Sequence, residues 1–241
     1  LIWQAFGWEE PQWVHLSVFL KPSGKGKMSK REAAQLSNDG YSIFIKDLQA
    51  LGYLPEAVIN WIALMGWSYD DHTEYFSMDD LVEKFSLKKL NPSPAAINFS
   101  KLDHFNKMHI KKLSDRELAE RIFPYFKKKS INVSLDDLEK ISPVLKDRII
   151  TLDDSVKMCG FLFREEITHE SEDLLIRDLS IEESKKISGE IVEVIKSVDE
   201  WTLESIETMV KAYMEKEGLA PKQLFSYLRE AISGQRATPP L

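Results

Sequence analysis

The second half of the sequence is a series of short amphipathic segments, most of which begin with serine or threonine followed by acidic residues. A hydroxyl at that position accepts a hydrogen bond from a free N–H of the first helical turn, so the pattern predicts helix starts. The irregular intervals exclude a tandem repeat. We expect helices throughout Ser114 to Ser233, in SDRELAERIFPYFKKK, SLDDLEKISPVLKDRI, TLDDSVKMCGFLFREE (capped by Thr151), SIEESKKISGEIVEVIKSV, TLESIETMVKAYMEKEG and APKQLFSYLREAISG.

The first half is predicted to be helical as well. Apolar residues spaced three and four apart indicate a helix that stops at Gly52, and a second helix that opens at Pro55 and runs to Gly66. Ser77, followed by two aspartates, caps a third helix.

Between these helices and the second half lies NPSPAAINFS, whose two prolines favour an ordered loop that becomes helical from about Ser100. Strands are expected only near the beginning, around Ser17–Leu20. We place one domain boundary near residue 75 and a softer one at 160–180.

The chain of 241 residues has a net charge of −7. It is therefore not a general nucleic-acid coat, because non-specific phosphate binding needs a broad cationic surface. Charge is uneven, however: residues 81–150 hold 15 Lys and Arg against 9 Asp and Glu, whereas 151–220 hold 8 against 18. This charge distribution leaves open the hypothesis that a basic stripe binds a nucleic acid locally. No apolar run approaches the roughly 20 residues that span a bilayer. The single cysteine, Cys159, predicts a buried thiol and a reducing compartment, the cytoplasm.

Residues 20–32, LKPSGKGKMSKRE, form a lysine-rich loop around two glycines. The loop is not a P-loop, because the G-x-x-x-x-G-K-[ST] spacing is absent. Lys27 and Lys30, expected to lie one helical turn apart, can flank a triphosphate and neutralise charge that shifts toward pyrophosphate. The alternative is a solvated turn.

KMSKR, Lys27 to Arg31, resembles the KMSKS signature of class I aminoacyl-tRNA synthetases. Its surroundings are similar to those of one branch, the bacterial-type glutamyl-tRNA synthetases. Similar blocks follow one another along nearly the whole chain: QAFGWEEPQWVHLSVFLKPSGKGKMSKR, GYLPEAVINWIALMGWS, FSMDDLVEKFSLKKLNPSPAAINFSKLDHFNKMHI and LREAISGQRATPPL.

The resemblance implies a mainly α fold: the remnant of a class I catalytic domain with its KMSKS loop, a helical stem-contact domain, and an all-α anticodon-binding bundle in two subdomains. The implied domains are 1–75 (end of the catalytic domain, loop and stem-contact helices), 76–165 (first helical tRNA-binding subdomain) and 166–241 (second anticodon-binding subdomain, truncated at its C-terminus).

The implied reaction is activation of glutamate with ATP, followed by its transfer to the 3′ end of tRNA(Glu). Lys27 and Lys30 are the implied catalytic residues, and ATP, expected with Mg²⁺, would contact Lys27, Met28, Ser29 and Lys30. Met28 would lie beside the adenine. Glutamate would bind to a catalytic half that this sequence lacks.

The resemblance also places anticodon recognition in the helical region. Unpaired bases are read through their edges, above all by arginine. Arg148 aligns with an arginine that distinguishes the third anticodon base, which separates glutamate from glutamine anticodons. The alternative for Arg148 is a surface ion pair with Asp147 or Asp154. The positions that hold the other anticodon bases correspond to Arg229, Thr238, Pro239 and Leu241.

The sequence starts LIWQAFGWEEPQWVHL, without an initiator Met or a signal-peptide pattern, and the family's HIGH-type motif is missing. We therefore expect a monomeric fragment that binds tRNA, contacts no membrane and is catalytically inactive. A second difference is His109, which stands where the family's block has tyrosine. No metal site is predicted, because His72, His104, His109 and His169 show no i, i+4 pairing and one cysteine cannot build a usual zinc site.

Alternatives stay open. One is a stand-alone helical tRNA-binding module that never had catalysis. Another is a glutaminyl-type ligase, although its C-terminal β-barrels disagree with the helical periodicity after Ser114. A third is a non-discriminating enzyme that also charges tRNA(Gln).

Overall fold

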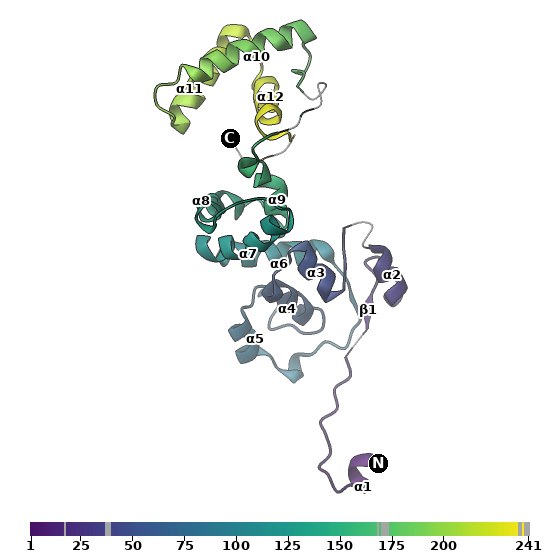
Figure 1. Ribbon diagram of the computed structural model, residues 1–241. Helices are drawn as coiled ribbons and strands as arrows, with labels where there is room; N and C mark the ends of the chain where they lie inside the picture. The colour runs from purple at the N-terminus through teal and green to yellow at the C-terminus, as the bar shows by residue number, and fades with distance from the viewer. Residues whose placement is uncertain (17, 37–39, 168, 170–173, 236–237, 239–241) are drawn as a thin grey trace. The chain divides into compact units, whose positions relative to one another are not determined.

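The structure is a computed structural model of the chain and describes residues 1–16, 18–36, 40–167, 169, 174–235 and 238. Within these residues it is built from helices and a single two-stranded sheet (Figure 1). The mainly α fold class is thus confirmed. The chain packs into two compact units, which we describe one at a time: unit 1 is Leu1–Tyr125 with Ser134–Val156, and unit 2 is Phe126–Val133 with Lys157–Leu241.

Unit 1 contains the sheet and the first half of the helices. Its elements, in chain order, are α1 (Ile2–Ala5), β1 (Phe19–Leu20), α2 (Lys30–Gln35), α3 (Ile45–Leu51), α4 (Pro55–Leu64), α5 (Met78–Lys84), the 3₁₀ turn η2 (Leu87–Lys89), β2 (Ala95–Ala96), α6 (Phe99–Lys112), most of α7 (Asp115–Lys128), α8 (Leu135–Leu145) and the start of α9 (Asp154–Cys159).

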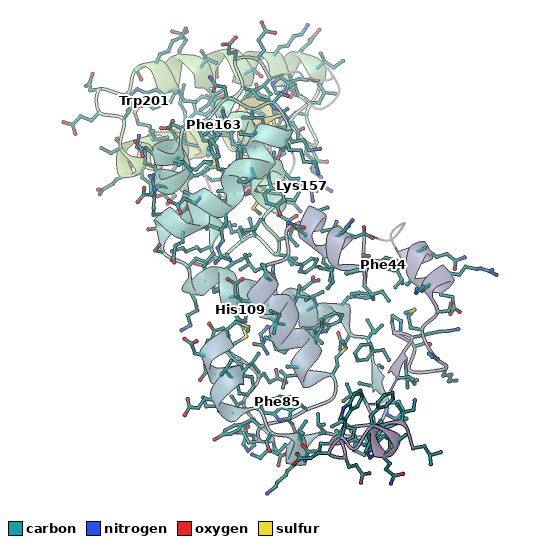
Figure 2. The ribbon with its side chains drawn as sticks, turned by 60° about the horizontal axis from the view of Figure 1, so that its bottom comes forward. Phe44, Phe85, His109, Lys157, Phe163 and Trp201 are labelled. Carbon is teal, nitrogen blue, oxygen red and sulfur yellow. The ribbon has the colours of Figure 1, made fainter. Side chains whose placement is uncertain are left out.

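Unit 2 contains the ends of α7 and α9 and the C-terminal helices. Its further elements are the 3₁₀ turn η3 (Gly160–Phe163), α10 (Ile181–Lys196), α11 (Leu203–Glu217) and α12 (Pro221–Ser233). The last turn of α7 belongs to this unit because Phe126 packs edge-on against Phe163 of η3, with ring centroids 5.8 Å apart. Phe163 is labelled in Figure 2. These packing units do not coincide with the predicted domains 1–75, 76–165 and 166–241, which stay a prediction.

Helix ends follow the local capping chemistry. Gly52, with φ of 92°, terminates α3 in the left-handed conformation that glycine favours. Pro55 occupies the first turn of α4, where its missing N–H costs nothing. Ser77 and Asp80 form a reciprocal capping box at α5. These ends agree with the sequence prediction.

The sheet corrects one prediction. β1 pairs in parallel with β2, with Phe19 opposite Ala95 and Leu20 opposite Ala96. The prediction that strands occur only near the beginning was therefore wrong. A strand of two alanines has no alternating pattern to read, and it exists because its backbone finds a distant partner. Ser17, part of the predicted strand, lies outside the described residues.

A second correction concerns the start of α9, which begins at Asp154 rather than directly after Thr151. The Asp154 carboxylate accepts hydrogen bonds from the backbone N–H groups of Ile150 (3.2 Å) and Thr151 (3.0 Å). It thereby stabilises a turn ahead of the helix, so Thr151 does not cap it.

Each unit has its own apolar core. In unit 1 the core joins α3, α4 and α6 through Leu48, Tyr53, Val58, Trp61, Ile97, Phe99, Leu102 and Phe105. In unit 2 it joins α10, α11 and α12 through Ile176, Ile187, Ile191, Val210, Tyr213, Met214, Leu224 and Leu228. Cys159 is also buried, as predicted.

Candidate functional site

The lysine-rich loop is a tight turn between β1 and α2. The Lys21 N–H donates to the Gly26 carbonyl (3.0 Å) and the Met28 N–H donates to the Phe19 carbonyl (3.0 Å). Gly26, with φ of 81°, adopts a conformation that other residues rarely accept. The loop tip therefore projects into solvent, with residues 22–27 exposed.

Lys27 and Lys30 are both exposed, and neither ammonium has an ion pair with a described residue. Lys21, by contrast, is paired with Glu32 (Nζ–Oε1 2.5 Å). Hydrogen bonds from Lys21 and then from the Ser29 hydroxyl lower the pKa of Glu32, so its carboxylate stays ionised and neutralises Lys21. Positive charge that can meet a ligand is thus left on Lys27 and Lys30.

The two residues between these lysines, Met28 and Ser29, already have partners in the structure. Ser29 is the N-cap of α2: its Oγ accepts from the Glu32 N–H (3.3 Å) and donates to the Glu32 carboxylate (2.7 Å). The side chain of Met28 is half-buried and packs against the unit 1 core. The two lysines are therefore separated by a helix cap, not by a turn of helix.

Arg148 lies in the turn between α8 and α9, and its side chain is exposed. Asp147, an expected partner, is paired instead with Lys111 of α6 (2.7 Å), which together with the weaker field of Arg148 lowers the pKa of Asp147. Asp154, the other expected partner, accepts two backbone N–H groups. Among the described residues the Arg148 guanidinium forms no ion pair, so it can meet a ligand.

Several lysines and arginines of residues 81–150 are already paired with carboxylates within unit 1. Exposed ion pairs of this kind contribute little stability, but they remove positive charge from the surface field. The pairs are Lys84–Asp80, Lys101–Glu74, Lys111–Asp147, Arg121–Glu56, Lys140–Asp137, Lys146–Asp115, and Arg116 with Glu120, Asp136 and Glu139.

The remaining predicted site residues belong to unit 2. Arg229 is half-buried on α12, and its Nε is buried without a hydrogen-bond partner among the described residues. Thr238 is buried. Pro239 and Leu241 lie outside the described residues. Arg148, by contrast, belongs to unit 1.

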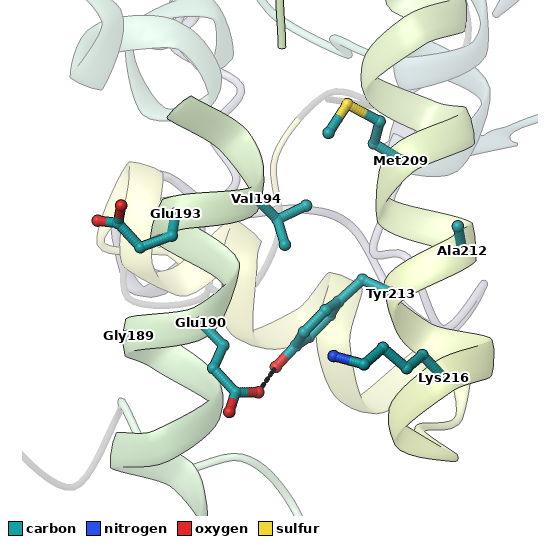
Figure 3. A pocket seen from close by; sticks show the side chains of 8 residues that line it. All are labelled: Gly189, Glu190, Glu193, Val194, Met209, Ala212, Tyr213 and Lys216. Atoms are coloured by element: carbon teal, nitrogen blue, oxygen red, sulfur yellow. Dashed lines mark hydrogen bonds between the residues drawn. The ribbon is translucent and has the colours of Figure 1, made fainter. Parts of the chain in front are cut away.

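Unit 2 also contains a cavity of about 630 Å³ between α10 and α11 (Figure 3). Small residues, Gly189 and Ala212, open it, and the Tyr213 hydroxyl donates to the Glu190 carboxylate (2.8 Å) at its edge. Burial, and then this hydrogen bond, raise the pKa of Tyr213. None of the predicted site residues that the structure describes lines the cavity.

The described residues contain no group of three or more His, Cys, Asp or Glu side chains placed to hold a metal ion. In the same residues no helix is both long enough and apolar enough to cross a membrane.

Comparison with known proteins decides the family. Residues 1–104 match the model of class I tRNA synthetases (E and Q), catalytic domain, and residues 117–241 match an anticodon binding domain. Glutamate–tRNA ligases of Herpetosiphon aurantiacus and Roseiflexus castenholzii are each 32% identical to this chain over its whole length. The chain belongs to the glutamyl-tRNA synthetase family.

Solved glutamyl-tRNA synthetases share its fold. A glutamate tRNA ligase from Elizabethkingia meningosepticum, crystallised in complex with its amino acid, matches 99% of this chain with a TM-score of 0.79 and 28% identity. The synthetase of Elizabethkingia anophelis matches with a TM-score of 0.72 and 27% identity. The chain spans about half the length of its glutamyl-tRNA synthetase relatives: 48% and 47% of the two curated proteins, and 49% and 48% of the two solved chains.

Sequence reasoning on this glutamyl-tRNA synthetase chain missed two residues that contact the Arg148 turn, Gly52 and Asn106. Both occur in blocks that resemble the family. Asn106 is a polar residue on the buried, largely apolar face of the amphipathic helix α6. That misfit was the available signal, since asparagine is a poor helix former unless its side chain has partners.

Proposed function

We propose that this chain is the tRNA-recognising part of a glutamate–tRNA ligase, and that Arg148 reads the third anticodon base. One observation carries the proposal: Arg148 is exposed and unpaired among the described residues, within the region that matches an anticodon binding domain. A planar guanidinium with several fixed donors can distinguish one base edge from another by two parallel hydrogen bonds.

The lysine-rich loop has the complementary role in the proposal. Lys27 and Lys30 hold the ATP triphosphate, which would enter with Mg²⁺, while Met28 and Ser29 line the same site. Their ammonium groups stabilise the negative charge that develops on pyrophosphate as the glutamate carboxylate attacks the α-phosphate. The activated glutamate then passes to the 3′ end of tRNA(Glu).

For the 241-residue chain by itself we propose a monomer in the cytoplasm that binds tRNA without catalysing the reaction. The lack of catalysis is supported by the extent of the match, because the chain aligns with about half of each relative. Whether tRNA(Gln) is also bound depends on how strictly Arg148 discriminates.

The test is a binding titration at one stated salt concentration. It compares tRNA(Glu) with the same tRNA whose third anticodon base is changed to that of tRNA(Gln). We expect the chain to prefer the unchanged tRNA, and Arg148→Gln to reduce this preference about tenfold, the order of one bidentate base contact. Arg177→Gln, which removes an exposed arginine paired with Asp178, is the control and should preserve the preference. Equal preferences in the Arg148 variant and the original chain would refute the role of Arg148, and lack of tRNA binding would refute the function.

A further inference from the structure

Asn106 bridges two backbone segments that are far apart in the sequence. It lies in α6 and is completely buried. Its Oδ1 accepts a hydrogen bond from the N–H of Leu54 (2.8 Å), and its Nδ2 donates to the carbonyl of Ile150 (2.6 Å), two residues after Arg148. Both halves of the amide are paired, and a buried amide that lost one partner would leave a polar group unsatisfied.

Gly52 contacts the same turn from the end of α3. Its carbonyl accepts a hydrogen bond from the N–H of Leu152 (2.9 Å). A Cβ at position 52 would lie 2.6 Å from the nitrogen of Asp153 and 2.7 Å from that of Leu152, closer than such atoms approach in proteins. Only glycine permits this approach, and its φ of 92° also favours glycine.

The turn that carries Arg148 is also stabilised by hydrogen bonds to residues just before and just after it in the sequence. The N–H groups of Arg148 and Ile149 both donate to the carbonyl of Leu145, at 2.9 and 3.0 Å. The next two N–H groups donate to the Asp154 carboxylate. Ile149 is completely buried, so the backbone is fixed while the Arg148 side chain remains exposed.

We infer that Gly52 and Asn106 are positioning residues for Arg148: together they hold the 150–152 backbone, and so fix the direction from which the guanidinium meets a base. The inference rests on the proposed role of Arg148 in anticodon reading. Discrimination between bases requires placement to a fraction of an ångström, because hydrogen-bond strength depends steeply on distance and angle.

Asn60 provides a matched control within the same unit. It is also completely buried, its Oδ1 accepts from the Phe76 N–H (2.9 Å), and its Nδ2 donates to the Glu74 carbonyl (2.9 Å). This amide holds the segment that precedes α5, and its Oδ1 also lies 3.2 Å from Nε2 of His109 in α6. It forms no hydrogen bond with the described residues 148–153. Loss of either asparagine therefore removes the same kind of bridge from a different place.

The experiment compares Asn106→Ala with Asn60→Ala in the 241-residue chain, at a temperature where both variants are folded. Amide hydrogen exchange is followed at residues 148–153 and at 74–76. The preference for the third anticodon base is measured by the titration described above. We expect Asn106→Ala to speed exchange at 148–153 and to reduce the preference at least fivefold. Asn60→Ala should speed exchange at 74–76 and keep the preference within twofold.

A double-mutant cycle separates positioning from general weakening. In an Arg148→Gln background, Asn106→Ala should reduce the preference no further, since nothing is left to position. A further reduction there would overturn the inference.

The failures can be told apart. Unchanged exchange at 148–153 in Asn106→Ala overturns the bridge itself. Faster exchange with an unchanged preference overturns the positioning role. If Arg148→Gln leaves the preference unchanged, the proposed function of Arg148 fails, and the positioning role fails with it even if exchange is faster.

Should Asn106→Ala not fold, Gly52→Ala replaces it, with Gly218→Ala as its control. Gly218 has a similar positive φ, of 67°, but a Cβ there would meet no atom within 4 Å. Gly52→Ala should reduce the preference at least fivefold and Gly218→Ala should not; equal effects overturn the inference.

Discussion

The guanidinium of Arg121 and the carboxylate of Glu56 form a two-pronged ion pair, with Nη1–Oε2 and Nη2–Oε1 distances of 3.1 and 2.8 Å. Glu56 lies at the start of α4, within the match to the catalytic domain, and Arg121 lies in α7, within the match to the anticodon binding domain. The pair therefore links the two family regions inside unit 1.

Removal of either partner should destabilise unit 1 modestly. Both side chains are about one-third exposed, so Arg121→Gln should cost about 1 kcal/mol in the free energy of unfolding, the upper range for such pairs. A urea-unfolding double-mutant cycle with Glu56→Gln should show positive coupling that decreases as salt rises. Strict additivity of the two single changes would contradict a direct interaction.

Stability should fall on mild acidification because of His109. Its imidazole, labelled in Figure 2, is buried. Nε2 lies 3.2 Å from Oδ1 of Asn60, and the ring packs against Tyr75. Burial lowers the pKa of His109, an effect opposed by Glu56 and reinforced by Arg121. The unfolded chain therefore binds more protons once the pH falls below the ordinary value of 6.5, and the free energy of unfolding decreases from that point as the pH approaches the lower, folded pKa.

The measurement is urea unfolding between pH 7.5 and about 5.5, the window in which an ordinary histidine begins to titrate. His109→Tyr removes the titrating group and should flatten this part of the pH profile. His104→Tyr changes an exposed histidine of the same helix and should leave the slope intact. Identical slopes in the original chain and in His109→Tyr would show that His109 does not cause the acid sensitivity.

The thiol of Cys159 should be unreactive in the folded chain. It is buried, and burial raises its pKa to about 11. At pH 8 the thiolate fraction is then about two orders of magnitude below that of a free cysteine, so alkylation by iodoacetamide should be slower by at least that factor. Mass spectrometry with and without denaturant checks this, and rapid labelling of the folded chain would contradict the burial.

The 241-residue chain should not support glutamate-dependent exchange of pyrophosphate into ATP. Lys27 and Lys30 can stabilise a triphosphate only if a nucleotide site holds it against them. Both lysines are exposed in this structure. Turnover above that of a protein-free blank would refute this expectation, and a full-length relative serves as the positive control.

The helix ends were predictable because capping is local. Gly52, Ser77 and Ser134 each act within about four residues of their own position, so the sequence pattern determines them. The late start of α9 escaped because the Asp154 carboxylate turns back to accept the N–H groups of Ile150 and Thr151, a contact that a capping pattern at Thr151 does not indicate.

Contacts between residues that are far apart in the sequence could not be predicted from it. The lysine-rich loop is contiguous, and its residues could be named together. Asn106 bridges Leu54 and Ile150, which are separated from it by 52 and 44 positions in the sequence. No spacing rule indicates contacts over such separations. The same limit hid the β2 strand, whose partner is β1.

The parallel pairing of Phe19–Leu20 with Ala95–Ala96 has a kinetic consequence. A strand of two residues does not persist alone, and closing so long a loop of chain is slow compared with winding the intervening helices. During synthesis the lysine-rich segment therefore emerges before its partner strand, and we expect it to take its final shape only after α3, α4 and α6 have formed. A nascent chain arrested before residue 95 would hold helices but not the finished lysine-rich loop.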